Sequence, residues 1–257
     1  MRPLEVWITK NYPVIERDRN FIEKRRKFYE ESYSKGEPPD AWHKYSQRVI
    51  NSTTRQWFDD LNSPQRKDIL NAGSGGNQYG IKASMVHLDL VKKRISEYPN
   101  YIVGDVSNIP ATEGSFDTVL CVGSVLNYAN PILAIQELRR VLRPGGLLIV
   151  EYERSGSLEY RLQYGVSSCL PVTAFYGNGQ TQLWAYGDEF IDGILALYRF
   201  KIIREKRFHG LSSIVLSLTN SPQLASRFLW KDSRLANLWP IRSITSNRML
   251  AVKKLAD

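Results

Sequence analysis

The stretch that decides the fold is DILNAGSGG, residues 68–76, in which a short apolar run leads into a glycine-rich turn. Glycines let the backbone turn tightly and approach a ligand, and the N–H groups at the start of a following helix attract an anion. We therefore predict a strand at 68–71, a turn at 73–76 and then a helix. Such a turn also occurs for purely structural reasons, so the segments downstream of it decide its meaning.

After this turn, short apolar runs alternate with helical stretches, which is the pattern of βα units and a parallel sheet. The apolar residues of 131–142 recur at i, i+3 and i+4, which predicts a helix there, and a second helix is expected at 188–198. The further expected strands are 84–88, 101–103, 118–122, 147–151, 201–208 and 248–253.

The remaining segments are expected to surround this sheet. Helices are predicted at 17–34 and 39–61, and 154–186 is expected to be irregular. A helix at 222–239 would carry an apolar stripe that packs on the domain, with a lid or a membrane-surface role as the alternatives. Its members are Leu224, Phe228, Leu235, Leu238 and Trp239. This organisation gives a helical cap and substrate region at 1–62 and one domain at 63–257, with insertions at 154–186 and 209–245.

Composition and charge narrow the class of protein. The 257 residues hold only two cysteines, Cys121 and Cys169, so we expect reduced thiols, no metal site and a cytoplasmic location. No run is apolar enough to cross a membrane, and the first residues lack the apolar core of a secretory signal. The net charge is +9, and residues 199–257 carry 12 Lys or Arg against 3 Asp or Glu. This asymmetry favours an anionic partner without naming it.

Two acids follow successive predicted strands. Asp89 ends the second strand, where a carboxylate can accept from both hydroxyls of a ribose, and Asp105 follows the third, where it can accept from the exocyclic amine of adenine. Together with the glycine turn they predict a nucleoside site at one sheet edge. A nicotinamide cofactor is the natural competitor, but its G-x-G-x-x-G fingerprint fails here because Gln78 stands at the third glycine position.

With these elements in order, the sequence resembles the class I S-adenosylmethionine-dependent methyltransferases, especially their small-molecule branch. The matching segments are DILNAGSGG (68–76), HLDL (87–90), VGDVSNIP (103–110), FDTVLCVGSVLNY (116–128) and LRRVLRPGGLLIVEY (138–152). The resemblance implies a Rossmann-like, seven-stranded, mostly parallel sheet with an antiparallel last strand and helices on both faces. It also implies S-adenosylmethionine as cofactor and S-adenosylhomocysteine as product.

The resemblance further implies a role for each matching residue. Asp89 would hold the ribose and Asp105 the adenine amine, with Leu90 and Val106 against the ring. The turn residues would line the methionine portion, and the end of the fourth strand would lie under the sulfonium and the acceptor. These two groups are Gly73, Ser74 and Gly75, and then Cys121, Val122 and Gly123.

One position departs from the family pattern. The family usually has an acid where this chain has Asn71, and that carboxylate helps to orient the amino group of the cofactor. Asn71 can still accept a hydrogen bond there but lacks the charge. The departure keeps open a protein that binds the cofactor, or only keeps the fold, without turnover.

Methyl transfer from a sulfonium chiefly requires alignment and exclusion of water, and a general base is needed only for a protonated acceptor. The candidate bases are His43, Tyr45, Glu151 and His209, each of which is also a plausible surface or packing residue.

The acceptor class rests on the residues just after the fourth strand. Amino-methylating nucleic-acid enzymes of the family usually carry N/D-P-P-Y/F there, whereas residues 124–128 read SVLNY. This favours methylation of an O or N atom of a small molecule. RNA methylation through the basic C-terminal segment remains the alternative. Peripheral membrane contact stays open, and no pattern indicates an oligomeric state.

Overall fold

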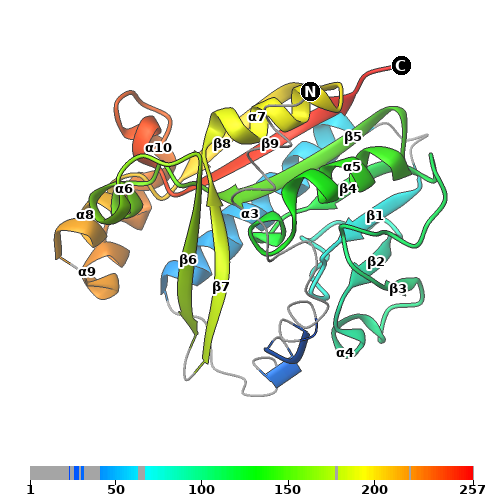
Figure 1. Ribbon diagram of the computed structural model, residues 1–257, viewed down its shortest axis with the longest axis horizontal. Coiled ribbons are helices and arrows are strands. Elements are labelled where there is room, and N and C mark those ends of the chain that lie inside the picture. Colours follow the sequence, from blue (N-terminus) through cyan, green and yellow to red (C-terminus); the bar gives the residue numbers. More distant parts are fainter. Residues whose placement is uncertain are drawn as a thin grey trace.

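The computed structural model describes residues 41–62, 67–176, 179–219 and 221–256, together with six residues between 23 and 31 (Figure 1). The helix predicted at 17–34 lies mostly outside these described residues. The architecture is a central sheet with helices on both faces and a hairpin that projects from one edge. No helix among the described residues is both long and apolar enough to cross a bilayer.

The central sheet has seven strands in the order β3-β2-β1-β4-β5-β9-β8. Strands β1 to β5 pair in parallel, and β9 runs antiparallel to both of its neighbours, β5 and β8. The strands span Ile69–Ala72 (β1), Val86–Asp89 (β2), Tyr101–Val103 (β3), Phe116–Cys121 (β4), Leu142–Glu153 (β5), Phe200–Phe208 (β8) and Asn247–Lys254 (β9). The predicted fold class is therefore confirmed.

The strand order reverses at β1, which lies between β2 and β4. Asn71 of β1 pairs with His87 on one side and with Leu120 on the other. Strands β2 and β3 lie on one side of β1, and β4 and β5 lie on the other. A crevice therefore opens at the carboxyl ends of the strands, where the order reverses. This topology fixes where a ligand can bind.

Alternating side chains of the strands build two cores. On one face, Val119 and Val150 pack with helices α5 (Pro131–Val141) and α7 (Asp188–Leu197). Helix α5 begins where predicted because Asn130 accepts the N–H groups of Ile132 and Leu133, while Pro131 sits in the first turn.

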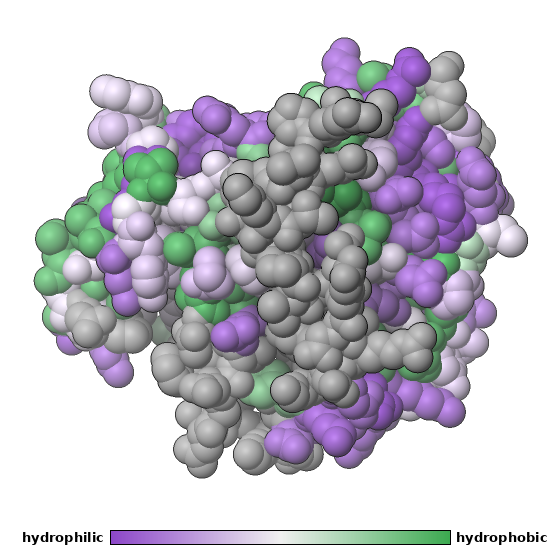
Figure 2. All heavy atoms as spheres, viewed as in Figure 1, coloured by the Kyte–Doolittle hydropathy of each residue, from purple (hydrophilic) through white to green (hydrophobic). Residues whose placement is uncertain are grey.

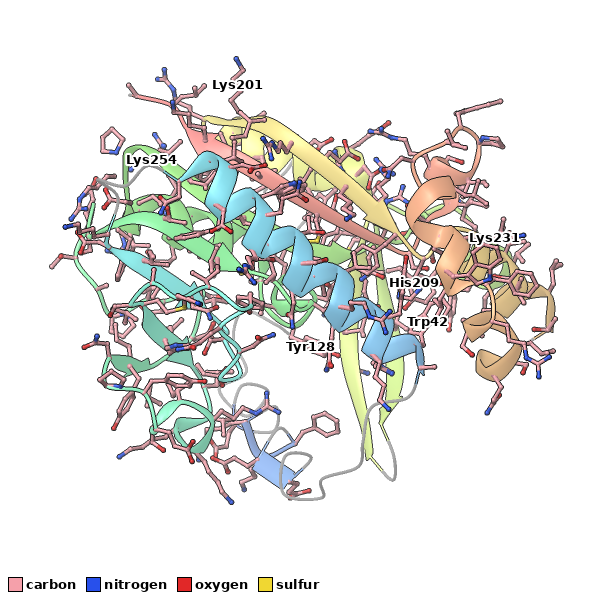
Figure 3. All side chains as sticks on the ribbon, turned by 180° about the vertical axis from the view of Figure 1, so that it is seen from behind. Trp42, Tyr128, Lys201, His209, Lys231 and Lys254 are labelled. Carbon is pink, nitrogen blue, oxygen red and sulfur yellow. The ribbon has the colours of Figure 1, made fainter. Side chains whose placement is uncertain are left out.

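On the other face, helix α3 (Ala41–Leu61) lies across the sheet (Figure 3). Its Trp57 and Phe58 belong to one buried cluster with Leu120 and Ile149 of the sheet. The remaining helices are α4 (Lys92–Ile95), α6 (Leu158–Tyr164), α8 (Leu211–Thr219), α9 (Pro222–Ser226), α10 (Leu229–Leu235), and the 3-10 turns η1 (Val125–Tyr128) and η2 (Ile241–Ile244).

The helix predicted directly after the glycine turn is wrong. The described residues between β1 and β2 form a chain of turns, with positive φ at Tyr79 and Gly80. None of residues 73–85 is helical. Tyr79, Ile81 and Met85 of this link are buried in the same core cluster as the inner face of α3.

The segment 154–186 is also more regular than predicted. After α6 it forms an antiparallel hairpin of β6 (Cys169–Tyr176) and β7 (Gly179–Tyr186). Leu170 and Leu183 lie on one face of this hairpin and pack near Tyr128 and Tyr160. Alternating apolar positions near the base of the hairpin are thus what bind it to the domain.

The single helix predicted at 222–239 is wrong as well, because α9 and α10 are separate. The residues that face the body are Ala225, Leu229, Asp232 and Ala236, all buried. They are spaced as one helical face, but they are mostly small. Of the bulkier stripe predicted from sequence, Leu235 is half-buried, whereas Leu224, Phe228, Leu238 and Trp239 are exposed. The expectation that the stripe packs on the domain is therefore corrected.

Candidate functional site

A cleft open to solvent lies at the carboxyl ends of β1, β2 and β4. It lies at the reversal of strand order, where the topology places a ligand crevice. Its walls are Gly73, Asp89, Leu90, Arg94, Gly104, Asp105, Val106, Gly123, Val125, Tyr128 and Ala129.

Two glycines form part of the cleft wall. Gly73 has φ of +69°, and a Cβ on it would lie 2.5 Å from Cγ2 of Val125, closer than side chains adopt. A Cβ on Gly104 would lie 3.0 Å from Cδ of Pro110, so that Pro110 would have to shift by a few tenths of an ångström. At both points the backbone itself forms the wall, which lets a ligand approach it closely.

The carboxylate of Asp89 is fixed at the end of β2. It is 8% exposed, Oδ2 accepts the N–H of Gly75 at 2.8 Å, and Oδ1 accepts the N–H of Val91 at 2.9 Å. A carboxylate offers about four lone-pair sites. Asp89 can therefore hold the turn and still accept two ligand hydroxyls.

Asp105 occupies the corresponding position after β3. Its Oδ1 accepts the N–H of Ser107 at 2.8 Å, which fixes the side chain on the cleft wall. Leu90 and Val106 line the same part of the cleft. Two acids and two apolar side chains thus surround one space, as a planar base with a neighbouring ribose requires.

The predicted anion site at the turn is not formed as expected. The N–H groups of Gly73 and Ser74 both donate to the carbonyl of Leu88, and that of Gly75 donates to Asp89. Of these turn residues, only Gly73 lines the cleft. With no helix after it, this turn does not present a set of free N–H groups to a carboxylate.

A cation that was not anticipated from the sequence lies next to the turn. Arg94, from α4, lines the cleft, and its Nη1 lies 3.4 Å from the position a Cβ on Gly75 would take. It is the one Lys or Arg among the described residues that form the cleft wall. The sequence signal was its position five residues after Asp89, on the same βα connection.

Asn71 lies below the cleft rather than in it. It is fully buried, and its Nδ2 donates to the carbonyl of Asn77 at 2.7 Å and contacts the sulfur of Met85 at 3.7 Å. The amide therefore secures the link between β1 and β2. Cys121 and Val122 are likewise buried beneath the cleft, and of the fourth-strand residues only Gly123 reaches its wall.

Glu151 has a structural role at the end of β5. It is fully buried, its Oε2 accepts the N–H groups of Gly123 and Ser124 at 3.0 and 2.6 Å, and its Oε1 accepts from Nδ2 of Asn247. Burial raises the pKa of this carboxyl. Glu151 thereby holds Ser124 at its left-handed φ of 60° and shapes the cleft floor from behind.

The other three candidate bases also lie away from the cleft wall. His43 is exposed on α3. His209 is fully buried, stacks on Trp42 with ring centroids 3.7 Å apart, and its Nε2 lies 2.7 Å from Oγ of Ser46 (Figure 3). Tyr45 packs edge-on against the same imidazole. His209 thus fastens the C-terminal part of the chain to Trp42, Tyr45 and Ser46 of α3.

A carboxylate that was likewise not anticipated contacts Ser124, the residue after Gly123 of the cleft wall. Glu153, at the end of β5, is half-buried, with Oε1 at 3.4 Å from Oγ of Ser124 and Oε2 at 3.3 Å from the hydroxyl of Tyr160. Burial, together with the nearby Glu151 and Glu159, raises the pKa of Glu153 to about 7. The only sequence signal was its position two residues after Glu151.

The cleft fits a nucleoside cofactor that bears a methionine group. Two acids stand where ribose and adenine amine would bind, apolar side chains flank the base position, and the glycines leave backbone open toward the space. Arg94 supplies a cation for the one carboxylate of such a molecule. S-adenosylmethionine matches this donor and acceptor set.

Comparison with known proteins agrees with this geometry. Residues 66–150 match the family described as the methyltransferase domain. An uncharacterized protein of Methanocaldococcus jannaschii is 29% identical over 139 residues, which are 49% of this chain and 61% of that protein. A demethylmenaquinone methyltransferase of Staphylococcus epidermidis is 32% identical over 79 residues, or 30% of this chain and 33% of that protein. The chain therefore spans less than two thirds of the length of either relative.

Among solved structures, the 1,6-didemethyltoxoflavin-N1-methyltransferase of Burkholderia thailandensis superimposes with a TM-score of 0.57 at 14% identity. The match covers 92% of this chain and 90% of that one, which was solved with 1,6-didemethyltoxoflavin and S-adenosylhomocysteine. At this identity the likeness establishes the fold. The family match over residues 66–150, together with the sheet order and the cleft, shows a methyltransferase domain with the class I S-adenosylmethionine-dependent fold.

Proposed function

We propose that this protein transfers a methyl group from S-adenosylmethionine to an O or N atom of a small-molecule acceptor. The observation that carries the proposal is the pair of acids, Asp89 and Asp105, on the wall of one cleft at successive strand ends. When bound, the cofactor would supply an activated methyl carbon, whose bond to sulfur would break as the acceptor takes the methyl group and loses a proton.

The residues of the chain bind and orient the cofactor. Asp89 accepts from the ribose hydroxyls and Asp105 from the adenine amine, while Leu90 and Val106 enclose the ring. Gly73 and Gly123 leave room beside the methionine arm. Arg94 replaces the usual helix N-terminus as the partner of the carboxylate, since the turn N–H groups are already used inside the protein.

The acceptor binds beside Tyr128, on the side that the hairpin covers. Tyr128 lines the cleft and packs with the cluster formed by Leu170 and Leu183 of the hairpin. An acceptor that arrives protonated needs a base. Glu153 is the carboxylate placed for this, because it contacts Ser124, which directly follows the cleft residue Gly123. A pKa near 7 suits a group that accepts a proton at neutral pH.

The charge arrangement favours a small molecule over RNA. Part of the positive charge of 199–257 is engaged within the protein: Arg204 pairs with Asp60, and Arg242 with Glu205. Arg248 is 4% exposed between Asp192 and Glu205, and the buried Nζ of Lys254 donates to the carbonyls of Arg139 and Leu142. Such cations hold elements together and are not available to phosphates.

The named relatives support the same acceptor class. The matches include enzymes named for demethylmenaquinone and for 1,6-didemethyltoxoflavin, which are small molecules. We also propose a cytoplasmic location, because only two cysteines in 257 residues is the usage expected of a protein in a reducing compartment.

Calorimetric titration tests the cofactor site. We expect S-adenosylmethionine and S-adenosylhomocysteine to bind, NAD to show no heat of binding, and Asp89→Ala to weaken both sulfur ligands. Folded protein that binds neither ligand would refute the proposal and favour a scaffold that has kept only the fold.

A labelling experiment then tests the acceptor class. The protein is incubated with methyl-labelled S-adenosylmethionine and, separately, with a metabolite extract or purified cellular RNA. Label in a low-molecular-weight fraction supports the small-molecule proposal, and label in RNA alone contradicts it. Glu153→Gln should reduce transfer to a hydroxyl acceptor while leaving the affinity for S-adenosylhomocysteine unchanged.

A further inference from the structure

The C-terminal lobe, residues 211–244, exposes large apolar side chains. It comprises α8, α9, α10 and η2 and lies at the opposite end of the molecule from β3 (Figure 1). Trp239 is 84% exposed, Leu218 76% and Trp230 70%. Leu224, Phe228 and Leu238 are exposed as well. Figure 2 shows hydrophobic atoms gathered at the end of the molecule formed by α8 and α9.

Scattered exposed apolar residues need no explanation, but a concentration of them in one small lobe does. Two tryptophans are the most informative members. Tryptophan combines a large apolar ring with one N–H donor and is enriched where one end of the residue is in water and the other in an apolar phase.

The lobe surrounds these side chains with positive charge. Its sequence contains four Lys or Arg, of which Arg242 pairs with Glu205 of β8, and a single acid, Asp232. Asp232 is fully buried and accepts hydrogen bonds from the backbone N–H and the hydroxyl of Ser212. Arg227 and Lys231 are exposed, and Nζ of Lys231 lies 4.8 Å from the centre of the Trp230 ring. The accessible charge of the lobe is therefore cationic.

The lobe is anchored in this orientation rather than folded with its inner face outward. Its inward residues, Ala225, Leu229 and Ala236, are buried, and Gly210 approaches it so closely that a Cβ would lie 2.6 Å from Cγ2 of Ile241. His209 lies within 3.3 Å of Ser212 at the start of α8. The small inward side chains set a close approach that leaves the bulky residues outside.

We propose that the C-terminal lobe binds the surface of an anionic lipid bilayer. Trp230 and Trp239 enter the interfacial layer, while Arg227 and Lys231 lie against the acidic headgroups. A second copy of the chain fits this surface poorly, because it would bring like charges together. The lobe would lie on the bilayer without spanning it.

The test uses the purified full chain with two kinds of vesicle, phosphatidylcholine alone and phosphatidylcholine containing phosphatidylglycerol. We expect flotation with the anionic vesicles only, a blue shift of tryptophan fluorescence on binding, and release at high salt. Trp230→Ser combined with Trp239→Ser should lower vesicle partitioning by at least about tenfold, and Arg227→Glu combined with Lys231→Glu should abolish it.

Matched controls separate the lobe from general hydrophobicity and charge. Val166→Ser removes an equally exposed apolar residue outside the lobe, and Lys201→Glu reverses an exposed charge on β8. Both should partition like the unchanged protein. Every variant is also titrated with S-adenosylhomocysteine, whose unchanged affinity shows that folding and the cofactor cleft are intact.

Three outcomes would overturn the proposal. They are no partitioning onto either vesicle, partitioning that the tryptophan and charge variants do not alter, or a dimer in light scattering that Trp239→Ser dissociates. The last would assign the surface to a second copy of the chain. None of these outcomes bears on the cofactor site, which is tested separately by calorimetry.

Discussion

The carboxylate of Asp89 accepts the backbone N–H of Gly75 at 2.8 Å, so the acid at the end of β2 holds the glycine turn that comes after β1. Its second oxygen accepts the N–H of Val91, which leads into α4. One side chain thus joins the three segments that form the cofactor side of the cleft. A change at Asp89 therefore affects both the ligand and the wall that receives it.

Replacing Asp89 by alanine should lower the affinity for S-adenosylhomocysteine by roughly 10- to 100-fold, because hydrogen bonds to a charged group contribute about 1.5–3 kcal/mol. Asp89→Asn, which keeps one acceptor oxygen, should lose less. Calorimetry measures both. Glu113→Ala, an exposed acid at the far end of β4, serves as the control and should bind normally. Equal affinities for all three variants would contradict the assignment.

Gly73→Ala should destabilise the fold for two reasons that can be separated. The positive φ costs about 1–2 kcal/mol for a residue with a Cβ, and the 2.5 Å contact with Val125 adds about 1–3 kcal/mol of overpacking. Gly73→Ala combined with Val125→Ala should recover part of the second cost. Urea unfolding measures the free energy.

The control for that pair is Gly114→Ala. Gly114 has φ of +63°, and its would-be Cβ meets only Cγ of Arg143 at 4.0 Å, so only the backbone cost applies. If Gly73→Ala were no more destabilising than Gly114→Ala, the close approach of Val125 would not constrain the cleft.

Arg94→Gln should discriminate between two ligands that differ in the carboxylate. The affinity for S-adenosylhomocysteine should fall by at least about tenfold, because a charge-assisted contact is lost. 5′-Methylthioadenosine, which has the same nucleoside and sulfur but no carboxylate, should be almost unaffected. Lys93→Gln, an exposed neighbour on α4, is the control. An equal loss for both ligands would place Arg94 against the nucleoside instead.

Glu153 should make the protein less stable as the pH rises. Its pKa is about 7 in the folded state against 4.5 as the ordinary value, so the folded state binds the extra proton between these values. Its stabilising contribution is complete below about pH 4.5 and is lost as the pH rises through 7, which corresponds to roughly 3 kcal/mol. Urea unfolding across this range measures the slope.

Glu153→Gln should flatten that slope, although Glu151 and Glu159, whose pKa values are also raised by burial, leave a remainder. Glu113→Gln, an exposed residue, should leave the slope as it is. Identical pH dependence in the unchanged protein and in Glu153→Gln would show that Glu153 titrates normally.

Much of the cofactor site could be predicted because its parts are local in sequence. Each parallel strand is a short apolar run, and the residue that ends it must lie at the ligand edge, so the strand pattern alone places Asp89 and Asp105 together. The candidate bases could not be placed in this way. His209 and Glu151 carry suitable chemistry. However, His209 is buried between Trp42 and Ser46, and Glu151 is buried beneath Gly123, so neither is within reach of a ligand.

The amino-acid sequence alone predicted the parallel βα pattern, the resemblance to the methyltransferases and the two acids on the wall of the candidate cleft, since these depend on periodicity, motifs and residues at strand ends. Three other features depended on tertiary packing. Packing placed α3 against the sheet, brought Arg94 to the cleft wall and Glu153 to Ser124, and turned the small face of the C-terminal lobe inward. The physical reason is that burial depends on how closely distant segments can approach, which no local pattern records.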